Sequence, residues 1–149
     1  MNIVRHVARC LLVALPMLLQ VARAASPLVV SEPWIRATPP GATAAAAYLV
    51  ITNSGGVADR LVEARCDAAS EVMVHVTALV DGVLQMRDGG LEVPAHGSAR
   101  LAPKGSHLML MGLTKPLRVG GWVHFTLRFE RAGTLQIEVP VRSATGAEP

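Results

Sequence analysis

Turn-forming residues recur at short intervals after residue 25, and this spacing limits what the chain can fold into. The segments between them are short runs rich in valine, isoleucine, leucine and threonine, and no long segment has helical periodicity. One of the turns, Asp81-Gly82, is a strong signal for a two-residue β-hairpin loop. Short strands at this spacing are typical of an antiparallel β-sandwich or Greek-key barrel, so we predict an all-β fold. The predicted strands are Leu28–Ile35, Ala45–Thr52, Arg60–Arg65, Val72–Val80, Val83–Arg87, Leu91–Val93, Ala99–Leu101, His107–Met111, Val123–Phe129 and Leu135–Val141.

The first 25 residues have the composition of a Sec-type export signal. Basic residues precede an apolar run over Cys10–Ala22, and Ala22-Arg23-Ala24 then places small residues where signal peptidase requires them. The apolar run is shorter than the roughly 20 residues of a membrane-spanning helix, so we expect no membrane span in the mature chain. We predict a signal peptide over 1–25, cleaved after Ala24 or Ala25, one β domain over 26–142 and a flexible tail over 143–149.

The charge of the chain does not indicate a nucleic-acid-binding surface. The formal net charge is +3, but three of the fourteen basic residues lie in the predicted signal. From residue 26 onward, eleven basic residues balance eleven acidic ones, and aromatic residues make up only 3% of the chain. Because a basic footprint and stacking aromatic side chains are what such a surface needs, we expect no nucleic-acid partner.

Cysteine pairs and catalytic motifs are also missing from the predicted domain. Cleavage of the signal removes Cys10 and leaves Cys66 as a lone thiol, which we expect to be packed and inert. The sequence has no Gly-rich phosphate loop, no nucleophile elbow, and no carboxylate placed as a general base beside His75 or His107. We therefore predict that the protein is not an enzyme.

A histidine and a methionine meet on the predicted hairpin. Folding the chain through the Asp81-Gly82 turn makes each opposed pair of residue numbers sum to 163, which pairs Thr77 with Met86 and His75 with Asp88. His75 and Met86 are then diagonal neighbours on one face, about 7–8 Å apart at the backbone. Both side chains are long enough to reach one metal ion from these positions.

A second histidine and methionine occupy another predicted strand. His107 and Met109 lie at positions i and i+2, so their side chains share a face. Thioether sulfur is soft and favours Cu(I) over calcium, magnesium or zinc, while imidazole binds copper in either oxidation state. The sequence therefore predicts a site for one Cu(I) ion per chain with the ligands His75, Met86, His107 and Met109.

The remaining methionines and histidines of the predicted domain are assigned differently. Met73 and Met111 have two interpretations, as sulfur atoms that shield the ion outside the four ligands or as core packing. His96 lies in a Pro- and Gly-containing segment that predicts an exposed turn. His124 lies in a strand whose alternation places it in solvent. We leave both of these histidines out of the site.

These residues resemble the motif of the periplasmic PCu(A)C-type copper chaperones. The motif is a histidine, ten residues, a methionine, a longer spacer and His-x-Met; here ten residues separate His75 from Met86, and twenty separate Met86 from His107. The spacer is one residue shorter than in the family, and the Asp88-Gly89-Gly90 turn can absorb the deletion without turning a ligand to the wrong face. The likeness covers nearly the whole mature chain, through Pro33-Trp34-Ile35-Arg36-Ala37, Asp59-Arg60-Leu61, His107-Leu108-Met109-Leu110-Met111-Gly112-Leu113 and Phe129-Glu130-Arg131-Ala132-Gly133.

The resemblance implies a cupredoxin-like Greek-key domain that works in the periplasm. It also implies transfer of one Cu(I) by ligand exchange to a cytochrome c oxidase subunit or to a Sco-like assembly factor. We expect Leu108, Leu110 and Leu113 to form a partly apolar docking rim, with part of this set in the core. A copper storage or resistance protein would use the same ligands, and the sequence does not separate storage from delivery.

Overall fold

The computed structural model describes residues 26–143, and all the regular secondary structure in this part is β-strand. Each of the ten predicted strands is present, and the observed strands extend the predicted ones by at most a few residues. The predicted signal over 1–25 and residues 144–149 of the predicted tail lie outside the described residues. Within 26–143, no helix is long and apolar enough to cross a membrane. The strands are β1 (Leu28–Arg36), β2 (Ala44–Asn53), β3 (Asp59–Cys66), β4 (Ala69–Val80), β5 (Val83–Asp88), β6 (Leu91–Val93), β7 (Gly97–Leu101), β8 (His107–Leu113), β9 (Trp122–Phe129) and β10 (Gly133–Arg142).

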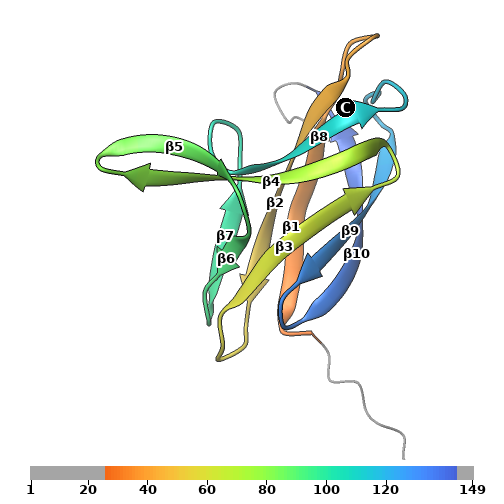
Figure 1. Ribbon diagram of the computed structural model, residues 1–149. Coiled ribbons are helices and arrows are strands. Elements are labelled where there is room, and N and C mark those ends of the chain that lie inside the picture. Colours follow the sequence, from red (N-terminus) through yellow and green to blue (C-terminus); the bar gives the residue numbers. More distant parts are fainter. Residues whose placement is uncertain (1–25, 144–149) are drawn as a thin grey trace, which may run out of the picture.

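The strands pair in the order β5-β4-β8-β2-β1-β10-β9-β3-β6, and β7 pairs with β2 outside this path. The β1–β10 pair is parallel, and the other pairs are antiparallel. The strands wrap around one core, and the β4–β5 hairpin projects sideways from it (Figure 1). We call the projecting hairpin, residues 76–88, the arm.

The core takes every second side chain of the strands that surround it. In β8, Leu108 and Leu110 are fully buried, whereas His107, Met109 and Met111 beside them are only partly buried. Phe125 and Leu127 of β9 reach the same core from the other side. Each fully buried leucine or phenylalanine contributes about 1.5–3 kcal/mol to the stability of the fold. Because alternate residues are buried, the other residues of β8 must face outward.

The arm has the register that its turn predicts. Asp81 and Gly82 have φ values of 50° and 79°, the left-handed conformation that a type I′ hairpin turn requires at both central positions. The turn pairs Val80 with Val83, and the ladder continues to the pair of His75 and Asp88. The predicted pairing of this hairpin is thus confirmed residue by residue.

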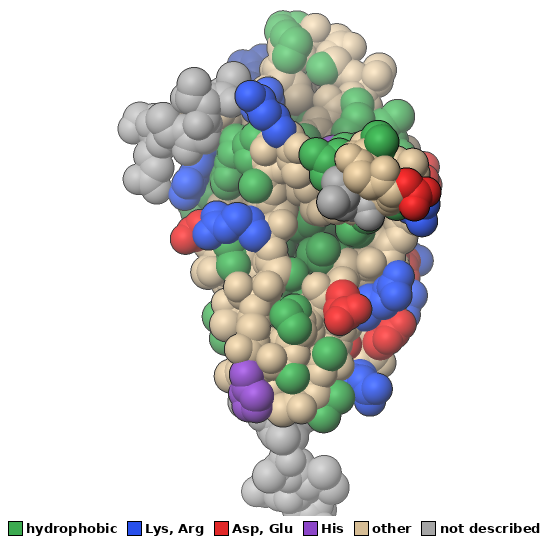
Figure 2. Space-filling model, turned by 90° about the vertical axis from the view of Figure 1, so that its left-hand side faces the viewer, with side chains coloured by type: hydrophobic (Ala, Val, Ile, Leu, Met, Phe, Trp, Pro, Cys, Tyr) green, Lys and Arg blue, Asp and Glu red, His purple; other side chains and the backbone are tan. Residues whose placement is uncertain are grey.

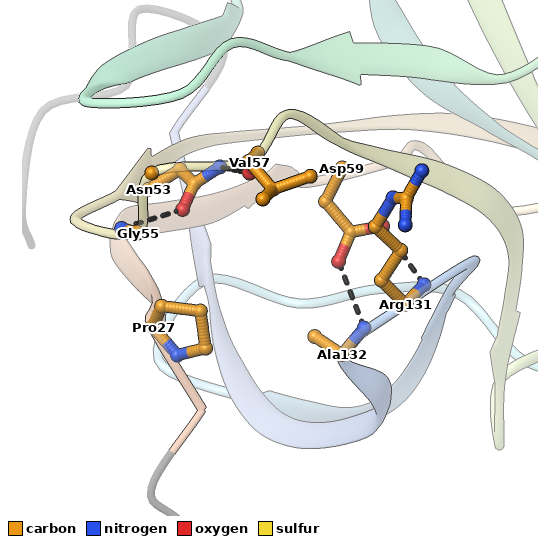
Figure 3. A pocket seen from close by; sticks show the side chains of 8 residues that line it. Pro27, Asn53, Gly55, Val57, Asp59, Arg131 and Ala132 are labelled. Atoms are coloured by element: carbon orange, nitrogen blue, oxygen red, sulfur yellow. Dashed lines mark hydrogen bonds between the residues drawn. The ribbon is translucent and has the colours of Figure 1, made fainter.

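A buried carboxylate joins the start of β3 to the turn between β9 and β10, at the end of the barrel away from the arm. Asp59 accepts hydrogen bonds from the backbone N–H groups of Arg60, Arg131 and Ala132 at 2.7–3.0 Å. Burial opposes ionisation of this carboxyl, but the three N–H donors outweigh it and lower the pKa of Asp59 below its ordinary value. A hollow of about 350 Å³ opens beside it (Figure 3). We call this group, Asp59 with its three donors, the Asp59 corner.

Candidate metal centre

The outward face of β4, β8 and β5 collects the histidines and methionines that the sequence singles out. His75 lies directly opposite His107, and Met73 directly opposite Met109, in the β4–β8 ladder. Met86 on β5 lies opposite Thr77, two residues beyond His75 along β4. Because residues opposed across antiparallel strands point to the same side, these side chains share one face. We call this the His–Met face: Met73, His75, Met86, His107 and Met109.

The local sequence determines which side chains reach this face. Leu108 and Leu110 of β8 point into the core, so His107 and Met109 must point outward. On the far side of β8, the alanine-rich start of β2 places Ala46 opposite Met109. A methyl group at this position leaves room for the longer methionine side chain beside it.

The two imidazole rings contact each other directly. Nδ1 of His75 lies 3.3 Å from Nε2 of His107, and the rings meet edge to face with centroids 5.0 Å apart. The His75 side chain is only 18% exposed. Two metal–nitrogen bonds of about 2.0 Å, the length typical of zinc–imidazole bonds, span about 3.3 Å when they meet at a tetrahedral angle. The spacing of the two nitrogens therefore suits one metal ion.

Each ring also has a second polar partner. Nε2 of His75 lies 3.0 Å from Oδ1 of Asp88, and Nδ1 of His107 lies 2.9 Å from the carbonyl oxygen of Gly105. On the β2 side, the ring of Tyr48 lies 6.5 Å from that of His107. The two imidazoles are therefore held by neighbours on several sides, which reduces the conformational freedom they would lose on binding an ion.

The donor set selects a soft metal. In residues 26–143, no three His, Cys, Asp or Glu side chains are grouped so that they could hold a metal ion. The further donors available on the face of His75 and His107 include the thioether sulfurs of the methionines. This combination fits Cu(I), and it does not fit calcium, magnesium or structural zinc. Thr77 lies on the same face, and its buried Oγ1 has no hydrogen-bond partner among the described residues.

The structure brings most of the predicted residues to one face, but Met86 lies on the neighbouring strand β5 and Met111 lies farther from the two histidines along β8. His75, His107, Met73 and Met109 form a compact patch on two paired strands. Met86 stands apart on the arm, where 52% of its surface is exposed. Met111 lies opposite the exposed Glu71, farther along the same ladder. The other two histidines of residues 26–143, His96 and His124, are exposed and belong to other strands and turns, as predicted.

The prediction of an apolar docking rim is confirmed only in its expectation that part of the leucine set is in the core. Leu108 and Leu110 are that part, and both are fully buried, so they do not form a rim. The exposed apolar side chains near the site belong instead to the arm, at Val83, Leu84 and Met86, which points toward the viewer in Figure 2. A carboxylate lies beside His75, because Asp88 contacts it. The pairing of His75 with Asp88 in the predicted hairpin was the signal for this contact.

The lone cysteine of the described residues is not part of the site. Cys66 lies at the end of β3 and packs against the core. Burial raises the pKa of its thiol above the ordinary value, although backbone hydrogen bonds from Ala68 and Ala69 oppose this. A thiol that stays protonated is a poor metal ligand and a poor nucleophile. The prediction of a packed thiol is confirmed.

Similar proteins support a common fold and family. The family model LpqE-like, "Putative lipoprotein LpqE-like", matches residues 28–141. "Putative lipoprotein Lxx21020" of Leifsonia xyli subsp. xyli is 38% identical over 120 residues, or 79% of this chain and 71% of that protein. The copper-bound PCuAC domain from PmoF2 is 29% identical, with 80% and 96% of the two chains covered and a TM-score of 0.69. The Cu(I)-bound solution structure of DR1885 from Deinococcus radiodurans is 30% identical, with coverage of 83% and 81% and a TM-score of 0.61.

These similarities extend over nearly all of the described chain. The structural matches include an apo PCuAC domain, from PmoF1, at a TM-score of 0.71. They confirm the predicted all-β, cupredoxin-like fold and the predicted family. The chain belongs to the LpqE-like family, which is of the PCu(A)C copper-chaperone type.

Proposed function

We propose that this protein is an exported, non-enzymatic metallochaperone that binds one Cu(I) ion and passes it to a partner protein. Its ligands are the imidazoles of His75 and His107 and the thioethers of Met86 and Met109. The observation that carries the proposal is the 3.3 Å separation of Nδ1 of His75 and Nε2 of His107, with methionines on the same face. That separation matches a tetrahedral ion, and the sulfur donors favour its cuprous state.

The relatives support this assignment. Two proteins of the same fold, the PmoF2 domain and DR1885, have copper-bound or Cu(I)-bound structures. The family and the Leifsonia relative carry lipoprotein names, which supports export from the cytoplasm. We place the protein in the periplasm, with a signal over 1–25 cleaved after Ala24 or Ala25, a copper-binding domain over 26–142 and a tail over 143–149.

The exposure of Met86 favours delivery of copper over storage. This thioether is half exposed and sits on the projecting arm, so an incoming ligand can approach the ion from that side. Thioethers are neutral, weak ligands, and an incoming thiolate or imidazole can bind before they leave. The acceptor in this proposal is a cytochrome c oxidase subunit or a Sco-like assembly factor, which takes the ion by ligand exchange.

Met73 and Met111 lie beside the four ligands. Met73 is opposite Met109, so it is the methionine placed to shield the ion from solvent or to replace Met86 when the arm is engaged. Met111 is two pairs farther along the ladder. We assign both to positions outside the four ligands.

X-ray absorption of the Cu(I)-loaded protein tests the site. We expect two nitrogen and two sulfur scatterers around one copper ion per chain. A copper ion without sulfur neighbours would contradict the proposal. To separate delivery from storage, a deletion strain should lose oxidase activity and keep its copper tolerance; a strain that loses copper tolerance alone would indicate storage.

A further inference from the structure

Each histidine of the His–Met face has a hydrogen-bond acceptor on the side of the ring that faces away from the other histidine. For His75 this acceptor is a carboxylate oxygen of Asp88, 3.0 Å from Nε2. For His107 it is the carbonyl oxygen of Gly105, 2.9 Å from Nδ1. A carboxylate and a carbonyl can only accept, so these two ring nitrogens carry the protons and donate them.

The nitrogens that remain are the two that approach each other. In a neutral imidazole one nitrogen is a donor and the other has a free lone pair. With Nε2 of His75 and Nδ1 of His107 as donors, the lone pairs are on Nδ1 of His75 and Nε2 of His107. These are the two atoms 3.3 Å apart. The hydrogen-bond partners therefore aim both lone pairs at the same place.

We infer that Asp88 is a positioning residue of the copper site: it holds the proton on Nε2 of His75 and so makes Nδ1 the copper ligand. Gly105 does the same for His107 and makes Nε2 its ligand. The two histidines thus bind copper through different ring nitrogens. This inference rests on the proposed Cu(I) site and adds a residue to it that is not a ligand.

Backbone hydrogen bonds hold the two segments that carry the acceptors. Gly89 N–H donates to the carbonyl oxygen of Val74 at 3.1 Å, which ties the end of β5 to β4 beside His75. On the other side, Ala102 N–H donates to Ser106 and Gly105 N–H donates to Ala102, at 2.8 and 3.0 Å, within the turn before β8. A carboxylate that orients a metal-binding histidine in this way contributes about 10–100-fold to metal affinity.

Asp88 and Met86 are two residues apart on β5, on the same face of the arm. The strand that supplies one thioether ligand therefore also supplies the group that orients His75. Displacement of β5 by a docking partner would remove the thioether and release the His75 ring together. Displacement of β5 would thus lower the affinity of the site for Cu(I), as release of the ion to a partner requires.

Nuclear magnetic resonance of the full chain, labelled with 15N-histidine and loaded with Cu(I) alone, tests the ring assignment. Cu(I) is diamagnetic, so two-bond 1H–15N correlations identify which nitrogen of each ring is bound. We expect copper on Nδ1 of His75 and on Nε2 of His107. Copper on Nε2 of His75 would overturn the inference and leave the proposed function intact, whereas no Cu(I) uptake would overturn the proposed function itself.

A matched pair of variants tests the role of Asp88. Asp88→Ala and Glu71→Ala each remove one exposed carboxylate from the same face, but only Asp88 contacts a histidine. In Asp88→Ala we expect the Cu(I) affinity, measured by chelator competition, to fall 10–100-fold. In the metal-free variant we also expect the His75 ring to become a mixture of its two neutral tautomers. Glu71→Ala should change neither. Equal effects of the two variants, or an unchanged His75 tautomer in Asp88→Ala, would overturn the inference.

Discussion

At the Asp59 corner, three backbone N–H groups surround one buried carboxylate. On the His–Met face, two imidazole nitrogens approach each other, methionines lie on the same face, and the Thr77 hydroxyl has no hydrogen-bond partner among residues 26–143. The corner has satisfied its hydrogen bonds from within the chain (Figure 3). On the face, the nitrogen and sulfur atoms are arranged for the proposed metal ion, which is not part of the chain. Both regions are polar, and both are built from residues far apart in the sequence.

The difference teaches how to tell a stabilising polar group from a functional one. A buried carboxylate with three donors is expensive to disturb, because its removal leaves those donors buried without partners. The partly buried imidazoles and thioethers should have less effect on stability, because their loss leaves few buried polar groups unsatisfied. Changes at the corner should therefore lower the stability of the fold without changing the Cu(I) affinity. Changes on the face should lower the Cu(I) affinity with little effect on stability.

The largest effect on stability is expected at the corner. Asp59→Ala should lower the free energy of unfolding by about 3 kcal/mol, because three N–H groups lose a charged acceptor. Urea denaturation followed by circular dichroism measures this. Glu130→Ala, at an exposed position next to the corner, should change the stability by less than about 0.5 kcal/mol. Folded Asp59→Ala should bind Cu(I) as the native chain does; weaker binding would mean that the two regions are coupled.

The largest effect on copper is expected from loss of an imidazole. His107→Ala should weaken Cu(I) binding by roughly 100-fold, or about 2.7 kcal/mol, because one of the two nitrogen ligands disappears. Chelator competition measures the affinity. His124→Ala, which removes an exposed histidine of β9, is the matched control and should leave the affinity unchanged. A large fall in the melting temperature of His107→Ala would contradict the prediction that the His–Met face contributes little to stability.

A smaller effect on copper is expected from a thioether. Met109→Leu keeps an apolar side chain of similar volume and removes one sulfur, so Cu(I) affinity should fall by roughly 10-fold. X-ray absorption of the variant should lose one sulfur scatterer. Met111→Leu makes the same change two pairs farther along the ladder and should have a smaller effect. If the two variants weaken binding equally, the ligand assignment on β8 is wrong.

The smallest effect is a pH dependence at His124. The hydrogen bond to Asp67 raises the pKa of this histidine above its ordinary value of 6.5, and Glu138 adds to the shift. A histidine whose pKa is higher in the folded state stabilises the protein fully below the unfolded pKa, and this stabilisation is lost as the pH rises through the folded pKa. Because His124 is exposed, the change should be slight. The melting temperature at pH 6 and pH 8 should differ less in His124→Gln than in the native chain; equal differences would remove His124 as the cause.

Much of the site was predictable because it depends on local rules. The Asp81-Gly82 turn determines the pairing of β4 with β5, and so predicts that Thr77 faces Met86 and His75 faces Asp88. The alternation of β8 places His107 and Met109 on one face. The contact between His75 and Asp88 follows from the same register, but its importance became visible only when the distance of 3.0 Å was known.

Other features follow from no local pattern. The sequence predicts that part of the leucine set of β8 is in the core, but it does not indicate that this part is Leu108 and Leu110. Nor does it indicate that the arm carries exposed apolar residues. It also does not indicate that Asp59 accepts from Arg131 and Ala132, 72 and 73 residues later. Which side of a strand is buried depends on the partner sheet, and a hydrogen bond between distant segments depends on how the whole barrel closes.

By itself the sequence determined the all-β class, the ten strands, the register of the arm and the residue types that select a soft metal. The tertiary structure decided that His75 and His107, 32 positions apart, lie opposite each other with their nitrogens 3.3 Å apart. It also decided which ring nitrogens face each other. The reason is physical: turn chemistry and side-chain alternation act over a few residues, whereas the pairing of β4 with β8 is selected by the packing of the complete core.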